Sequence, residues 1–151
     1  MLAKTGFAFV LAFLSTCVTA RAECVVMTAK HVMAQPGIEL VFSGRVLNVA
    51  RAGDLGTRVT FEVSRVWKGS VPDPFDLYVW ERGAEMPRFE KGQRYVALAA
   101  RLTDRTTRTE VGLSGTNAPA FIATSCSGRE ILSPDIEREL GSGYEPTRVR
   151  K

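Results

Sequence analysis

Apolar and polar residues alternate with a period of two over two long stretches in the first half of the chain. The second stretch places apolar residues on one face of a strand, with polar residues between them, at Val59, Phe61 and Val63. Val66 and Trp67 then leave this alternation by one residue, as happens at a β-bulge. Gly44, in the first stretch, is the kind of residue that a strand carries where it bends. The pattern predicts two curved strands, Ile38–Val49 and Thr57–Trp67, that begin a small closed barrel.

Three more strands are predicted further along the chain, at Phe75–Trp80, Arg94–Ala100 and Ala120–Thr124. Spacing of apolar residues over Val25–Ala34 predicts a short N-terminal helix. A second helix is expected after Ser133, an N-cap serine followed by proline, and it ends at Leu140 before Gly141. The polar stretch from Arg101 to Asn117 reads as a solvated excursion, and Lys68–Pro74 as a turn.

Five strands with a long excursion before the last one and a helix at the end are typical of one fold class. We predict a mostly β protein: a five-stranded OB-fold Greek-key barrel with a C-terminal helix and a short N-terminal helix. The 151 residues suffice for one such domain.

The first 22 residues have the pattern of an export signal. Lys4 precedes a short apolar run, and Ala20-Arg21-Ala22 offers a small-x-small cleavage site. This divides the chain into a cleaved signal peptide (1–22), a barrel domain (23–141) and a flexible basic tail (142–151), and predicts a periplasmic or secreted protein without a membrane span. Two alternatives stay open. Cleavage after Ala20 is one, and acylation of Cys17 in a lipobox-like stretch, which would anchor the protein to the cell envelope, is the other.

Charge gives little support for nucleic acid as a partner. The formal charge of +4 includes Lys4 and Arg21, so that +2 remains after cleavage of the leader. Phe61, Tyr78 and Trp80 could stack on bases, but export and the low charge both argue against that interpretation.

Two cysteines, Cys24 and Cys126, remain after cleavage. In an oxidising compartment they are expected to form a disulfide, which would close a loop of roughly 100 residues and contribute about 4 to 5 kcal/mol in the chain-entropy model. The alternative is two separate buried thiols. Neither cysteine has the spacing of a redox motif or of a zinc site.

Catalytic and metal-binding residues are not predicted. The only histidine, His31, stands between Met27 and Met33, a set that could hold copper(I), but we interpret these methionines as packing residues of a helix. A single histidine leaves no Ser/His/Asp set. The carboxylates on the C-terminal helix are interpreted as capping or solvating groups: Asp135, Glu137 and Glu139. We therefore predict a non-catalytic chain without a cofactor.

Tyr78 and Trp80 are candidates for binding another protein. They share the outer face of the third predicted strand, and exposed aromatic side chains are favoured at interfaces. The alternative is that the N-terminal helix or a loop covers them.

Four segments together resemble the tissue-inhibitor-of-metalloproteinases-like branch of the netrin-like OB-fold domains, as found in short exported bacterial proteins. They are Val41–Val46, Val59–Gly69 (VTFEVSRVWKG), Phe89–Tyr95 (FEKGQRY) and Thr124–Gly128 (TSCSG). The likeness covers roughly Cys24 to Leu140.

The resemblance implies two functions. Inhibitors of this family begin with Cys-x-Cys, and the amine and carbonyl of the first cysteine chelate the zinc of a protease. Here the simplest mapping places Cys24 on the second family cysteine, paired with Cys126, and the first falls at Ala22 in the leader. With Glu23 as the mature N-terminus the chelating end is lost, which predicts a binding module with an unidentified protein partner. Inhibition of a zinc metalloprotease through the N-terminal edge, around Glu23 and Cys24, is the alternative.

Overall fold

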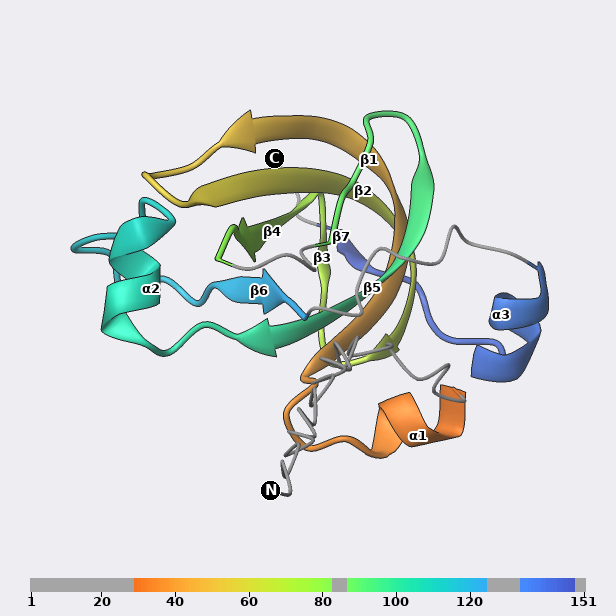
Figure 1. Cartoon of the computed structure of the whole chain (residues 1–151). Coiled ribbons are helices and arrows are strands. Elements are labelled where there is room, and N and C mark those ends of the chain that lie inside the picture. Colours follow the sequence, from red (N-terminus) through yellow and green to blue (C-terminus); the bar gives the residue numbers. More distant parts are fainter. Residues whose placement is uncertain (1–28, 83–86, 125–133, 149–151) are drawn as a thin grey trace, which may run out of the picture.

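A closed barrel of five strands forms the centre of the protein (Figure 1), in a computed structural model that describes residues 29–82, 87–124 and 134–148. The strands follow one another around the barrel in the order β1-β2-β4-β6-β5, and β5 returns to pair with β1. Their bounds are Leu40–Arg51 (β1), Gly56–Lys68 (β2), Phe75–Trp80 (β4), Arg94–Arg101 (β5) and Phe121–Ala123 (β6). The small mostly β barrel expected from the sequence is confirmed.

Neighbouring strands are antiparallel except for β4 and β6, which run parallel and meet at Tyr78 and Ile122. Only the first half of β1, Leu40–Arg45, lies between two partners, because its register with β5 ends where Arg45 meets Arg94. Within the described part of the chain, the residues of β1 after Val46 pair with β2 only, and they form one arm of a long curved hairpin.

Three irregularities bend the β1–β2 hairpin. The register shifts between Val41 and Phe42, between Ser43 and Gly44, and between Val46 and Asn48. The first shift leaves Trp67 as the extra residue on β2, so the bulge expected from the phase slip there is confirmed. A Cβ added at Gly44 would lie 2.6 Å from the main-chain oxygen of Glu62, and this close approach of two strands explains the glycine.

Aromatic side chains fill the inside of the barrel. Phe42 packs edge-to-face on Phe61 and Phe75, with ring centroids 5.3 Å apart in both pairs. Phe89 continues the chain of rings to Phe61 at 5.4 Å and to Tyr95 at 5.1 Å. Aliphatic residues surround these rings: Leu40, Val46, Val59, Val63, Val66, Val71, Leu77 and Val79. The barrel is therefore a packed core and not a ligand cavity.

Two short helices, α1 (Ala29–Ala34) and α3 (Pro134–Leu140), contact each other at one end of the barrel. There a second apolar cluster gathers residues of both helices and of the barrel wall: Met33, Ile38, Val41, Trp67, Val96, Leu98, Ile136 and Leu140. Lys68 Nζ donates to the main-chain oxygens of Met33 and Gln35, at 3.0 and 2.9 Å. Residues 25–28 and 133 of the two predicted helices lie outside the described part.

The polar excursion between β5 and β6 contains a helix, α2 (Arg105–Glu110), where the sequence predicted only a solvated loop. Asp104 caps it, since its carboxylate accepts from the main-chain N–H of Thr107 at 2.6 Å and from the Thr107 hydroxyl at 2.8 Å. Arg108 holds the following loop by donating to the main-chain oxygens of Leu102, Thr116 and Ala118. The helix is thus fixed by side-chain bonds more than by an apolar face.

The C-terminal segment is held against the barrel as far as Arg148. Tyr144 exchanges two main-chain hydrogen bonds with Val66, at 2.8 and 2.9 Å. Strand β7 (Thr147–Arg148) then pairs in parallel with β3 (Pro72–Asp73), inside the stretch expected to be only a turn. This part of the predicted tail therefore lies against the barrel wall.

Candidate interaction surface

The two aromatic residues predicted to bind a partner are half-buried under the excursion that contains α2. Tyr78 and Trp80 pack against a third apolar cluster, whose other members are Leu102, Val111, Leu113, Ala120 and Ile122. Trp80 Nε1 donates to Glu110 Oε2 at 2.7 Å. Arg82 bonds the other oxygen of that carboxylate at 2.9 Å and stacks its guanidinium 5.7 Å from the Trp80 ring. Tyr78 and Trp80 therefore do not form an open patch. A loop covers them, as the alternative interpretation of the sequence had it, and this loop is 102–120.

Other residues singled out in the sequence lie outside the described part: Cys17, Glu23, Cys24, Met27 and Cys126. The disulfide and the N-terminal binding edge stay predictions. His31 and Met33 are both on α1, where Met33 packs into the apolar cluster with α3. Among the described residues no group of three or more His, Cys, Asp or Glu side chains could hold a metal ion.

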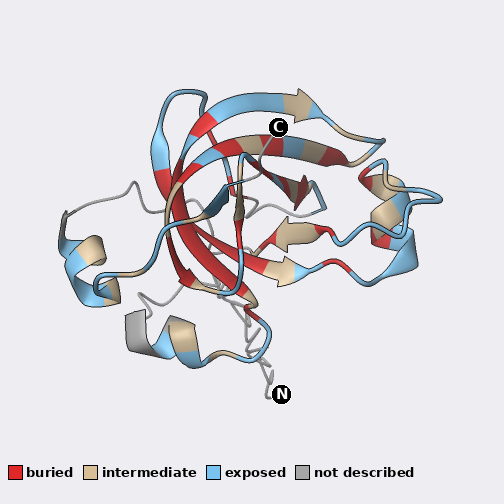
Figure 2. Ribbon diagram, turned by 180° about the vertical axis from the view of Figure 1, so that it is seen from behind, coloured by how far each residue is buried: buried red, intermediate tan, exposed pale blue. Residues whose placement is uncertain are grey.

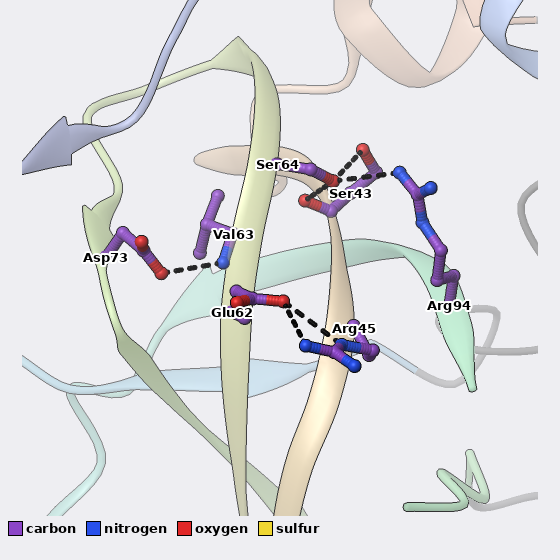
Figure 3. Close-up of polar contacts among 7 residues, drawn as sticks. All are labelled: Ser43, Arg45, Glu62, Val63, Ser64, Asp73 and Arg94. Carbon is purple, nitrogen blue, oxygen red and sulfur yellow. Dashed lines mark hydrogen bonds and ion pairs between the residues drawn. The ribbon is translucent and has the colours of Figure 1, made fainter. Parts of the chain in front are cut away.

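Polar side chains form two neighbouring groups of contacts on the outer wall, where β1, β2 and β5 lie side by side (Figure 3). Arg45 donates from Nε and Nη2 to Glu62 Oε2, at 3.0 and 2.9 Å. Above this pair the buried Ser43 hydroxyl lies 3.3 Å from that of Ser64, which also accepts from Arg94 Nη2 at 3.3 Å. The ion pair joins β1 to β2, and the serine–arginine group joins β1, β2 and β5 but gives the Arg94 charge no carboxylate in the described structure.

The second half of β1 is the most exposed part of the barrel wall. Figure 2 shows this strand in pale blue and tan beyond Val46, with β2 beside it. Leu47 and Val49 are 38% and 40% exposed, and with Tyr144 they are the exposed large hydrophobic residues of the described chain. Sequence reasoning missed this edge. The signal for it was Leu47, which follows the core residue Val46 and so breaks the alternation in the same way as Trp67.

Arginines surround this exposed edge. Arg51 donates to the main-chain oxygen of Asp54 at 2.7 Å, so its charge is not neutralised by that bond. Arg58 faces Tyr78 across the β2–β4 ladder and is exposed. Over the whole hairpin, Leu40–Lys68, there are five basic residues and two acidic ones. The edge therefore lies in a basic region.

A separate depression of about 610 Å³ lies beside α2. Its lining includes Thr103, Arg105, Arg108, Ser114 and Asn117. The Arg108 guanidinium is already engaged by the loop that forms the rim, and the other lining residues come from this one excursion. We therefore assign the depression to the way the loop closes on itself.

No family model and no curated protein matches this chain. In the described structure no helix is both long and apolar enough to cross a membrane.

Proposed function

We propose that this chain is an exported, non-catalytic OB-fold module that binds another protein on the outer surface of its barrel. One observation carries the proposal: aromatic rings occupy the inside of the barrel, so that recognition by this part of the chain falls to its outside. The outside combines a strand edge that has no main-chain partner among residues 29–82, 87–124 and 134–148, two exposed apolar residues and an excess of arginine, features that favour a protein partner.

The strand order supports the OB assignment. In a five-stranded Greek-key barrel of this type the first strand is long and curved and pairs with two different strands along its length, as β1 does with β2 and β5. The segments that resemble the netrin-like domains fall on β1, on β2, on the approach to β5 and just after β6. The leader pattern supports export to the periplasm or the medium.

Recovery of the tagged mature protein from its own host tests this function. We expect a second protein to co-purify in a fixed ratio, and to be absent when an unrelated exported protein carries the same tag. Recovery of the chain alone from both the cell envelope and the medium would refute the proposal. Stoichiometric inhibition of a zinc metalloprotease by the mature chain would replace it with the inhibitor function implied by the resemblance.

A further inference from the structure

We infer that the second half of β1 captures an extended acidic segment of the partner protein by β-strand addition. The inference rests on the proposed binding function, and it names the surface and the kind of partner.

Main-chain groups at this edge are available for a further strand. On the side away from β2, the last bonds join Val46 to Gln93 and Gly92, at 2.9 and 2.8 Å. Successive residues of an antiparallel strand direct their N–H and C=O groups alternately to the two sides. Ala52 N donates to Gly56 O, so the main-chain N–H and C=O groups of Ala52 and Ala50 point toward β2. The main-chain groups of Val49 and Arg51 therefore point away from β2. No main-chain bond joins those outward groups to another described residue. This is the unpaired edge that strand addition requires.

The side chains provide an apolar contact on each face of such an added strand. Val49 pairs with the fully buried Val59, so its side chain lies on the inner side of the barrel wall. Leu47 is the extra residue of the bulge next to Val46 and is exposed on the outer side. An incoming strand with apolar residues at alternate positions would cover either Leu47 or Val49, depending on which of its faces is apolar.

Charge decides between a second copy of this chain and a different partner. A second copy would bring its own excess of arginine to the same edge, which opposes self-pairing. An extended segment whose apolar residues cover Leu47 would instead place its carboxylates on the side of Arg51, and one in the opposite orientation would place them on the side of Arg58 and Arg94. None of these arginines pairs with a carboxylate of the described structure. The occupant that fits is therefore a strand of alternating apolar and acidic residues.

A titration of the isotope-labelled mature protein followed by NMR tests this inference. The probe is a synthetic peptide of about eight residues with alternating valine and glutamate, long enough to pair with the exposed half of β1. We expect shift changes centred on Leu47–Arg51 and slower hydrogen exchange at the amides of Val49 and Arg51. The matched valine–lysine peptide is expected to bind at least roughly tenfold more weakly, because it meets the same arginines with the opposite sign.

Two variants separate strand addition from general attraction of charge. Val49→Pro removes an N–H that faces away from β2, a position where a strand tolerates proline, and should abolish peptide binding while the barrel stays folded. Arg51→Glu should weaken binding roughly five- to tenfold, whereas Arg105→Glu on α2, the matched control, should leave it unchanged.

Three results would overturn the inference: undiminished binding to the Val49→Pro variant, equal binding of the lysine peptide, or shift changes centred away from β1. Protection of the same amides with rising protein concentration and no peptide would assign the edge to a second copy instead. If the peptide does not bind but a host protein still co-purifies, the edge is wrong and the binding function stands.

Discussion

Gly44→Ala measures how closely β1 and β2 approach each other at the bend of the barrel. The added methyl would lie 2.6 Å from the main-chain oxygen of Glu62 and 3.3 Å from the Phe61 ring, and ordinary contact begins at 3.4 Å. A carbonyl in a strand ladder cannot turn aside as a flexible side chain can. Overpacking of this kind costs about 1 to 3 kcal/mol of stability.

Gly37→Ala is the matched control, since a Cβ there meets no atom within 4 Å. Neither glycine has a positive φ angle, so alanine fits the backbone at both positions. Each substitution also stabilises by about 0.4 to 1 kcal/mol, because alanine has fewer conformations than glycine in the unfolded chain. That gain cancels when the two variants are compared, and the difference between them reports the overpacking alone.

The assay is urea unfolding of the mature protein, followed by tryptophan fluorescence. With a slope of about 2 kcal/mol per molar urea, a 2 kcal/mol difference places the Gly44→Ala midpoint about 1 M below that of Gly37→Ala. Equal midpoints with unchanged slopes would refute the close approach of β1 and β2, and with it the sharp bend that closes the barrel.

Two further predictions concern the excursion that covers Trp80. Glu110→Gln should destabilise the protein by about 0.5 to 1.5 kcal/mol in urea unfolding, because the half-buried carboxylate accepts from the Trp80 indole and the Arg82 guanidinium. The control is Asp135→Asn, which breaks an exposed ion pair and should change the urea midpoint little. Hydrogen bonds from Thr107 hold the pKa of Asp104 below its ordinary value of 3.8. The stability that the ionised carboxylate contributes is therefore complete above pH 3.8 and is lost as the pH falls below that value. Asp104→Asn should therefore lower the urea midpoint near neutral pH and lower it less near pH 3, and a loss of equal size at both pH values would contradict this assignment.

The barrel strands could be predicted because each carries an alternation that the fold uses directly. Val59, Phe61 and Val63 are all buried in the barrel, and the phase slip at Trp67 is a real bulge. The same logic that predicted the slip at Trp67 applies to Leu47, where it marks the start of the unpaired edge. A bulge is visible in sequence, but whether a strand has a neighbour on its second side depends on where distant segments end.

Helix α2 was not predictable from propensity. Its six residues, RTTRTE, include three β-branched threonines and no apolar face, which disfavours a helix in an isolated chain. Bonds of Asp104 and Arg108 fix it, and the excursion packs on the barrel through Leu102, Val111 and Leu113. The sequence did place Tyr78 and Trp80 correctly on one outer face, but which element covers them follows from this docking alone.

The proposal that the protein binds a partner through the edge of β1 is tested most directly inside the producing cell. A photoreactive amino acid is placed at Leu47 in one variant and at the exposed Thr106 of α2 in another. We predict one discrete protein adduct at Leu47, which Val49→Pro abolishes and which is absent at Thr106. An adduct at Thr106 alone, or one at Leu47 that survives Val49→Pro, would contradict the account.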